Sequence, residues 1–371
     1  MSNADDQPVV PLPRHPDTDE WASRVRPEDP PGEPGDWPAR GSVPVSLLVP
    51  ALNEERNLAG CLRRAAWASE LVVIDSDASS DGTVPIAQAF GASVFRFRYD
   101  RERGWPKKKN WALEHIPWKN QWVLILDADE YMTPELAREI EDVVLGRWKP
   151  TGKPSAKGCG DGYWINRRFN FMGRWIRGCG YYPSWNVRLF KHQHGRYERL
   201  GNLGDTGTGD NEVHEHLVLD TGKPGYLKHD FLHYAYPDLT VWTEKHNRYS
   251  TWEAHTELAE SQERVKSSLS GSPIERRRWL KRMTRRIPFR PTARFLYAYI
   301  IQRGFLDGYP GFIMCRLLGW YEFMSVAKRE DMKRRAREGE NYPDRIAPPR
   351  GPDATSRRHV GERPSADADI R

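Results

Sequence analysis

Short apolar runs alternate with helical stretches over the first half of the chain. Four runs have the length and β-branched content of buried strands, and each is followed by residues with helical spacing. We expect strands at 45–49, 71–74, 93–97 and 122–126, and helices from about residue 54, at 83–90, at 107–115 and at 134–147. This alternation predicts right-handed βαβ units, a parallel sheet and therefore an α/β fold.

The remaining segments differ in composition. Residues 1–41 and 333–371 are rich in Pro and charged residues and poor in large aliphatic ones, so we expect both to be disordered. Residues 150–240 are rich in Gly, Trp, Tyr and Arg, which predicts an irregular half with a mixed sheet. We therefore expect an α/β domain at 42–240, followed by a basic helical region at 241–332.

The charge balance narrows the kinds of partner. The 371 residues include 57 Lys and Arg against 51 Asp and Glu, a net charge of +6, which predicts an anionic partner. The four cysteines form no Cys-x-x-Cys pair, so we expect reduced, packed thiols and a cytoplasmic protein. We expect neither a signal peptide nor a simple membrane span.

Carboxylates follow the fourth predicted strand. Asp127 and Asp129 come directly after an apolar run, and ligands of open α/β sheets bind at the carboxyl ends of strands. Hard divalent cations prefer oxygen ligands and often share them with phosphates. We expect Asp129 to bind a metal ion, while Asp127 contacts a ribose or a water. Glu130 is expected to be a surface acid at a helix start.

Two further polar groups flank this strand. Asp75 and Asp77 end the second strand, where an acid commonly binds a base or ribose, whereas Asp81 is expected to cap the next helix. Lys107, Lys108, Lys109 and Asn110 precede the fourth strand. These lysines could neutralise phosphates, although we expect at least one of them on a solvated helix face.

A Glu between two histidines is a further candidate. His214 and His216 are two residues apart with no helix evident, which does not fit the zinc motif with two histidines four apart. Glu215 has apolar and aromatic neighbours that could raise its pKa and make it a general base. A salt bridge at a strand edge is an equally open interpretation.

Together these motifs resemble family 2 glycosyltransferases of the GT-A fold. The resemblance rests on residues 50–55, 75–83 and 126–130. Residues 173–177, 188–190, 213–215 and 292–328 are similar to the branch that contains lipopolysaccharide-core β-glucosyltransferases. The resemblance implies a Rossmann-like nucleotide-binding half, a mixed-sheet acceptor half and a C-terminal helical region.

The resemblance also implies a reaction. Mg²⁺ or Mn²⁺ on Asp129 would bridge to a nucleotide-diphosphate sugar, expected to be a UDP-sugar, and Glu215 would deprotonate the acceptor in an inverting transfer. Either Asp75 or Asp77 would bind the base. The acceptor would be a glycan or glycolipid of cell-surface polysaccharide or lipopolysaccharide biosynthesis. We expect the nucleotide sugar to contact Pro50, Leu52, Glu54, Asp75, Asp77, Lys107, Asn110, Asp127 and Ala128.

The basic region suggests a location. Residues 276–294 hold nine Arg or Lys and no acid, with Trp279 and other apolar residues interleaved. This pattern is typical of a helix on an anionic leaflet and predicts a peripheral protein at the inner face of the cell membrane. A packed helical cap is an alternative, and the absence of RNA-binding motifs argues against nucleic acid.

Other functions are weighed against this one. A sugar nucleotidyltransferase would need a Gly-rich phosphate loop after the first strand, and residues 50–55 lack one. A non-catalytic nucleic-acid- or glycan-binding protein of similar fold is a further alternative, but acids stand at every expected position of the site.

Overall fold

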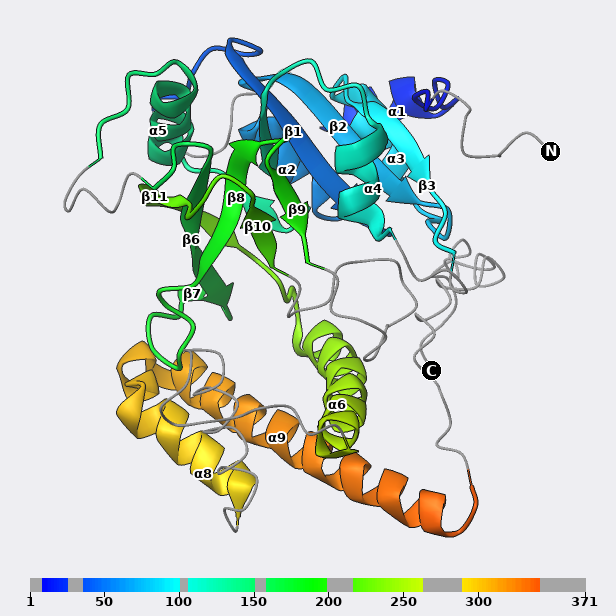
Figure 1. The fold of residues 1–371 in the computed structure, drawn as a ribbon, viewed down its shortest axis with the longest axis vertical. Coiled ribbons are helices and arrows are strands. Elements are labelled where there is room, and N and C mark those ends of the chain that lie inside the picture. The colour runs from blue at the N-terminus through cyan, green and yellow to red at the C-terminus, as the bar shows by residue number, and fades with distance from the viewer. Residues whose placement is uncertain are drawn as a thin grey trace, which may run out of the picture.

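The chain forms a large sheet with a layer of C-terminal helices beside one end of it (Figure 1). The two predictions at Glu215 and at residues 276–288 lie outside the part of the chain that the structure describes. The computed structural model describes residues 9–25, 36–100, 106–150, 158–198, 216–262 and 289–340.

The first half of the sheet is parallel, in the order β3-β2-β1-β4. Its strands are β1 (Val43–Ala51), β2 (Ala68–Ser76), β3 (Ser93–Phe97) and β4 (Trp122–Ile125). The helices between and after them are α2 (Leu58–Arg64), α3 (Thr83–Ala89), α4 (Lys108–His115) and α5 (Pro134–Val144). The expected α/β fold is confirmed.

Local sequence explains these elements well. Alternate side chains of a strand point to opposite faces of its sheet, and both faces are covered here, so β1 is apolar almost throughout. Leu47 and Val49 pack into one buried cluster with Leu58, while Leu48 packs into another with Leu113. Helix α5 begins as predicted: Thr133 caps it by accepting a hydrogen bond from the Leu136 amide, and Pro134 occupies the first turn.

The second half of the sheet is mixed, as expected. Beyond β4 the order continues β8-β6-β11-β5, and only the β6–β11 pair is parallel. The strands are β5 (Glu130–Tyr131), β6 (Gly162–Phe171), β8 (Trp185–Lys191) and β11 (Gly225–His233). A short strand, β7 (Arg174–Trp175), pairs with the end of β6, and β9 (Gly195–Tyr197) pairs with β10 (Leu217–Leu219).

The C-terminal helices pack around a third apolar cluster, in which Trp242 and Met314 meet Phe169 and Phe171 of β6. A buried carboxylate also joins them, because Glu257 accepts hydrogen bonds from Arg290 and Arg329 on two other helices. Among the described residues no helix is both long and apolar enough to span a bilayer. The elements are α6 (Leu239–Gln262), α8 (Arg290–Leu296), η3 (Tyr297–Ile301), η4 (Gly304–Asp307) and α9 (Gly308–Arg337).

The expectation of disorder is wrong at two places. Residues 9–25 contain α1 (Thr18–Val25), and this segment is tied to the sheet domain. The Leu12 amide donates to the Val94 carbonyl, 2.6 Å away, and the buried Thr18 hydroxyl donates to Gln88 at 3.0 Å. Composition cannot reveal such tertiary contacts. At the other end α9 continues past residue 332, where i,i+3 and i,i+4 ion pairs between Asp331 and later arginines support the helix.

Candidate active site

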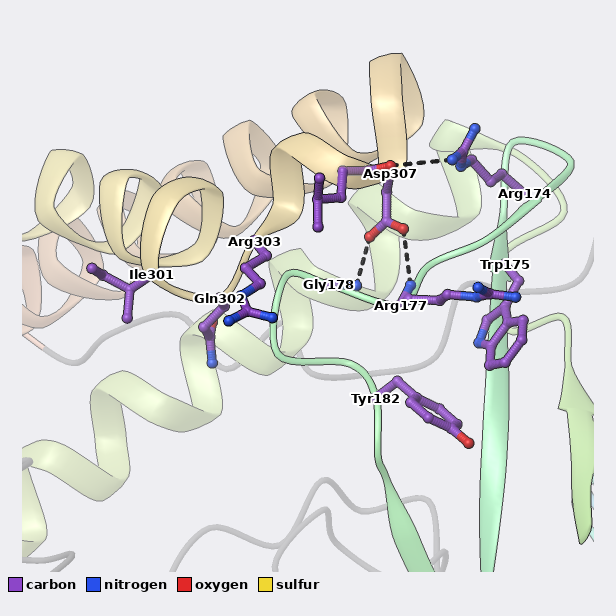
Figure 2. A pocket seen from close by; sticks show the side chains of 10 residues that line it. Arg174, Trp175, Arg177, Gly178, Tyr182, Ile301, Gln302, Arg303 and Asp307 are labelled. Atoms are coloured by element: carbon purple, nitrogen blue, oxygen red, sulfur yellow. Dashed lines mark hydrogen bonds between the residues drawn. The ribbon is translucent and has the colours of Figure 1, made fainter.

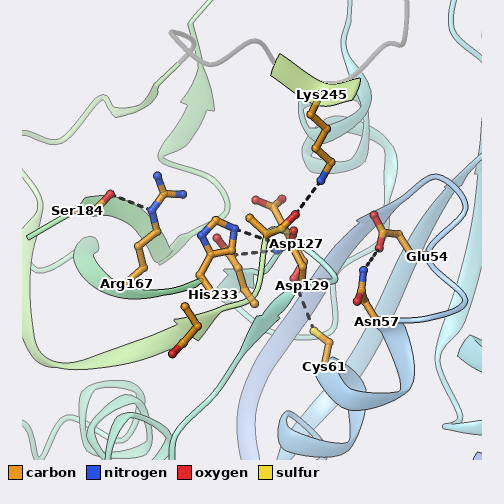
Figure 3. A network of polar contacts seen from close by, with 12 residues as sticks. Glu54, Asn57, Cys61, Asp127, Asp129, Arg167, Ser184, His233 and Lys245 are labelled. Carbon is orange, nitrogen blue, oxygen red and sulfur yellow. Dashed lines mark hydrogen bonds and ion pairs between the residues drawn. The ribbon is translucent and has the colours of Figure 1, made fainter. Parts of the chain in front are cut away.

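Polar side chains from several strand ends meet at one edge of the sheet. Figure 3 shows Asp127 and Asp129, which follow β4, beside His233 at the end of β11 and Glu54 after β1. Lys245 approaches the same group from α6. The topology explains this meeting, since the carboxyl ends of β1 and β4 lie at the same edge of a parallel pair.

Arg188 of β8 holds two of the acids. One of its guanidinium nitrogens contacts Asp127 Oδ2 at 2.7 Å and also contacts Glu130, and Lys109 Nζ donates to Asp127 Oδ1 at 2.9 Å. Burial disfavours the Asp127 carboxylate, but Arg188 and Lys109 outweigh it and hold the pKa of Asp127 well below its usual range. The first predicted acid is therefore an ionised, neutralised carboxylate.

Glu130 is not the surface acid that we expected. Its side chain is fully buried, where it pairs with Arg188 and accepts a hydrogen bond from the Asp127 amide at 3.0 Å. Burial raises the pKa of Glu130, and Arg188 opposes this shift. The residue shapes the turn after β4 and positions Asp127, a role that its place beside a helix start did not suggest.

Asp129 is the acid without a full set of partners. Its Oδ1 lies 3.5 Å from His233 Nε2, and within the described ranges neither Asp129 Oδ1 nor His233 Nδ1 has a hydrogen-bond partner although both atoms are buried. Burial alone would raise the pKa of Asp129, but the neighbouring imidazole outweighs this and lowers it. A buried carboxylate oxygen left unsatisfied calls for a ligand.

This donor set fits a divalent cation held partly by substrate. The part of the chain that the structure describes holds no cluster of three His, Cys, Asp or Glu side chains that could bind a metal by itself. Mg²⁺ and its relatives are, however, commonly bound by one or two protein groups, with substrate phosphates and water completing the shell. Asp129, assisted by His233, supplies such a partial set.

Glu54 adds a titratable group to this edge. It is half-buried and accepts a hydrogen bond from Asn57 Nδ2 at 2.9 Å. Burial raises the pKa of Glu54 to about 7, against Asn57, which lowers it, and the charge of Asp129 adds to the increase. Glu54 therefore changes its charge near neutral pH, which makes the charge of the site dependent on pH.

The two acids of the second strand differ in access. Asp75 is fully buried, and its two oxygens are occupied by the Ser79 hydroxyl and by Arg96 at 2.7 Å. Burial raises the pKa of Asp75, and both partners oppose this. Asp77 has a 44% exposed side chain and lies 3.8 Å from Arg98. Of the two carboxylates, Asp77 is the one open to a ligand in this conformation.

Asp81, which we expected to cap the next helix, has a structural role, although the N-cap residue of α3 is Gly82. Asp81 Oδ1 accepts hydrogen bonds from the amide and hydroxyl of Thr83 at the start of α3, and its Oδ2 accepts from the Glu55 amide at 2.9 Å. It thereby fastens the loop after β1 to the loop after β2. The remaining predicted contacts lie around these loops: Pro50 and Leu52 are half-buried, and Ala128 is buried between the two acids.

The lysine cluster is largely buried. Our expectation that at least one of its lysines lies on a solvated helix face is therefore wrong. Lys107 and Lys108 are 4% and 1% exposed, and Lys108 Nζ donates to the Ala51 carbonyl at 2.9 Å. Asn110 is structural, because its amide bonds both backbone groups of Tyr197 at 2.9 Å. Lys109 is half-buried and pairs with Asp127, so the start of α4 faces the strand ends, whereas Glu114 near its other end is exposed.

Three residues of the site were not predicted as such: Arg188, His233 and Lys245. Arg188 did carry a signal, since a charge inside the apolar strand β8 must be paired when it is buried. His233 and Lys245 carried none, because only tertiary packing brings β11 and α6 to the end of β4. Lys245 Nζ donates to the Ala235 carbonyl at 3.3 Å, and its charge helps to lower the pKa of Asp129.

Comparisons with known proteins agree on the family. Residues 46–172 match the family model described as Glycosyl transferase family 2. An uncharacterized glycosyltransferase of Rickettsia typhi is 24% identical over 304 residues, which cover 80% of this chain and 91% of that protein. A second, from Rickettsia bellii, is 26% identical over 268 residues, covering 71% and 78%.

Solved structures give more remote likenesses. A mannosyltransferase from Pyrobaculum calidifontis, solved with GDP-Man and Mn²⁺, is 14% identical with a TM-score of 0.41, covering 84% of this chain and 94% of that one. Residues 1–349 of TarS from S. aureus, solved with UDP, are 14% identical with a TM-score of 0.35, covering 80% and 92%.

The pKa of Glu54 predicts how stability depends on pH. Between its ordinary value of 4.5 and about 7 the folded state keeps a proton that the unfolded state has lost, so stability falls as pH rises through this window. Glu54→Gln cannot titrate. We expect it to gain stability relative to the wild type between pH 5 and pH 8, by at most about 3 kcal/mol.

Urea unfolding at pH 5 and at pH 8 measures the free energy of unfolding of both proteins. Glu114→Gln, which changes an exposed acid on α4, is the matched control. A stability difference between wild type and Glu54→Gln that stays constant from pH 5 to pH 8 would contradict the assignment.

Proposed function

We propose that this chain is a family 2 glycosyltransferase, in line with the match at residues 46–172, and that it transfers a sugar from a nucleotide-diphosphate sugar to a glycan or glycolipid acceptor. The observation that carries the proposal is Asp129, a half-buried carboxylate just after a parallel-sheet strand, whose Oδ1 atom is buried and has no hydrogen-bond partner among the described residues. A UDP-sugar is the donor that we propose, and the acceptor belongs to cell-surface polysaccharide or lipopolysaccharide biosynthesis.

The donor would lie across the strand ends. The exposed Asp77 would accept a hydrogen bond from the base, with Asp75 supporting the same loop through Ser79. Asp127 would contact the ribose, and its ion pairs with Lys109 and Arg188 favour the ionised form. Pro50 at the end of β1 and Leu52 and Glu54 in the loop after it would also contact the donor, and Lys107 and Ala128 complete the set. Asn110 is left out because the backbone of Tyr197 occupies its amide.

Asp129 and His233 would hold the divalent cation, Mg²⁺ or Mn²⁺. When bound, the ion neutralises the negative charge that develops on the diphosphate as the bond to the sugar breaks. The protein contributes a fixed position for Asp129, since Glu130 and Arg188 define the turn that precedes it. Glu54 lies close enough to affect the charge of this site, and its pKa near 7 makes cation binding weaker at acid pH.

Glu215 is proposed as the general base. It would take the proton from the acceptor hydroxyl as that oxygen attacks the anomeric carbon, while the bond from this carbon to the diphosphate breaks. A single displacement of this kind inverts the configuration. The proposal rests on the Val-His-Glu sequence at 213–215 and on the family, because Glu215 lies outside the described residues.

We also propose that the protein binds a membrane surface. Large apolar side chains are exposed on the turn between α8 and α9, including Ile301 at 66% and Tyr309 at 68%. Part of this surface is continuous, because Tyr309 and Tyr299 both contact the Phe312 ring. Exposed apolar surface beside Arg303 and other arginines fits an anionic leaflet. The basic run at 276–288 would add to this attraction.

The first prediction concerns the metal. Asp129→Asn removes the carboxylate charge but keeps the size of the side chain, so we expect no sugar transfer and no Mn²⁺-dependent gain in UDP affinity, with an unchanged circular dichroism spectrum. Asp142→Asn, an exposed acid on α5, is the control and should behave as wild type. Normal turnover by Asp129→Asn in the presence of EDTA would refute the assignment.

The second prediction concerns the base. Glu215→Gln keeps the size and the hydrogen bonding of the side chain but cannot accept a proton. We expect unchanged donor binding and a fall in kcat of about 10²-fold or more, measured with saturating donor. A rate within a few-fold of wild type would mean that another acid, with Asp210 and Glu212 as the next choices, is the base.

The third prediction concerns the membrane. The exposed residues Leu296, Ile300 and Phe305 changed together to Ser should reduce flotation with vesicles of phosphatidylcholine and phosphatidylglycerol by about tenfold or more, because each side chain loses part of a 1.5–3 kcal/mol burial term. Leu145→Ser with Val218→Ser, also exposed, is the matched control. Equal flotation of the triple variant and wild type would exclude this surface.

A further inference from the structure

A pocket of about 760 Å³ lies between residues 174–178, which begin with β7, and residues 301–307, which run from the end of η3 through η4 (Figure 2). Arg174, Trp175 and Arg177 come from the first segment, Arg303 and Asp307 from the second, and Tyr182 closes one side. The pocket is separate from the acids described above and has no part in the donor site.

The pocket carries excess positive charge. Three exposed guanidinium groups line it, and in the described part of the chain none of them forms an ion pair. Asp307 is the one carboxylate in its lining, and its oxygens accept hydrogen bonds from the backbone amides of Arg177 at 3.1 Å and Gly178 at 2.6 Å. Arg174 donates to the Leu306 carbonyl at 3.2 Å, which leaves its charge uncompensated. These groups are suited to an anion.

An aromatic wall accompanies the charge. Arg177 stacks over the Trp175 ring at 4.2 Å, and Tyr182 meets the same ring edge-on at 5.1 Å. The Trp175 indole nitrogen is buried and has no hydrogen-bond partner among the described residues. A stacked guanidinium is held in a fixed orientation, and an unsatisfied indole N–H is a free donor. Both favour a ligand with acceptor oxygens.

Backbone contacts join the two segments that line the pocket. Besides the two bonds to Asp307, the Cys179 amide donates to the Gln302 carbonyl at 3.0 Å. Gly178 packs so closely that a Cβ would lie 2.6 Å from the Arg303 carbonyl oxygen. Arg303 itself adopts φ +56°, a left-handed conformation that is uncommon outside glycine. Preformed sites bind with a smaller loss of conformational freedom.

The pocket is also connected to the donor site. Strands β6 and β11 are parallel, so their carboxyl ends lie at one sheet edge; β11 ends at His233, and β6 leads into β7 with Trp175. The Phe169 ring contacts both His233, at 5.9 Å, and Tyr181, at 4.4 Å. Tyr182 donates to Asp230, three residues before His233. Ile301 and Leu306, which are exposed, form the outer rim.

We propose that this pocket binds a phosphate ester carried by the acceptor. The proposal rests on the proposed glycosyl transfer and names one chemical feature of its acceptor. Two or three guanidinium groups and the indole N–H would surround the phosphate oxygens, while the attached sugar or glycerol would lie toward the outer rim at Ile301 and Leu306. The phosphate could belong to a lipid headgroup or to a soluble glycan, and the experiment distinguishes these sources.

The test uses the full-length protein and two phosphate probes. Glycerol 3-phosphate is titrated calorimetrically, with glycerol as the uncharged comparison, and vesicles of phosphatidylcholine with phosphatidic acid are compared with phosphatidylcholine alone. We expect Arg177→Gln and Trp175→Phe each to weaken phosphate binding, the former by about tenfold or more. Arg316→Gln is the matched control, since Arg316 is exposed, stacks on Phe295 at 5.2 Å and lies outside the pocket.

The outcomes separate cleanly. Loss of glycerol 3-phosphate binding in Arg177→Gln but not in Arg316→Gln supports the proposal with a soluble phosphate. The same pattern seen only on phosphatidic acid vesicles supports it with a lipid source. Equal loss in both variants, or no phosphate binding by wild type to either probe, overturns it. Mn²⁺-dependent UDP binding is measured in parallel: its absence in wild type counts against the proposed transfer and leaves the phosphate result to be judged separately.

Discussion

The ion pairs of Arg188 with Asp127 and Glu130 hold the site together. They form where the parallel half of the sheet meets the mixed half, since β8 lies antiparallel to β4 at this junction. A guanidinium buried here must be paired, and three acids within four residues need a cation if they are to lie together. Arg188 satisfies two of the acids, and the third, Asp129, is left with an unsatisfied oxygen.

The C-terminal helices are part of this arrangement and are not a separate appendage. Strand β11 ends at His233, and the chain then enters α6, whose Lys245 returns toward Asp129. Farther along α6, Glu257 bonds Arg290 of α8 and Arg329 of α9. One continuous helix therefore connects the acid cluster to the two helices whose turn carries the exposed apolar residues.

Local sequence predicted what local interactions decide. The four parallel strands and α5 agree with the structure closely, because apolar runs, a hydroxyl cap and a proline at the first helical turn act over a few residues. The acids at the strand ends were also predicted from local sequence, because they directly follow apolar runs. Tertiary contacts decided the rest: Asn110 bonds a distant backbone, Glu130 is buried by Arg188, and α1 is ordered by Gln88 and Val94.

The shared direction of β6 and β11 decides which residues lie together at one edge of the sheet. Because the two strands run parallel, the residues that follow them lie at the same edge, so His233 and the β7 loop face the same side of the sheet. An acceptor bound through an anionic group near Trp175 would then approach the donor along this edge. The exposed side chains of Ile301 and Leu306 border the same pocket, so apolar surface adjoins the cationic groups. Under the proposed function, a lipid-linked acceptor would enter there. The cationic pocket thus lies between the apolar surface and the acid cluster, an order that suits a substrate with a membrane anchor, an anionic link and a reactive sugar hydroxyl.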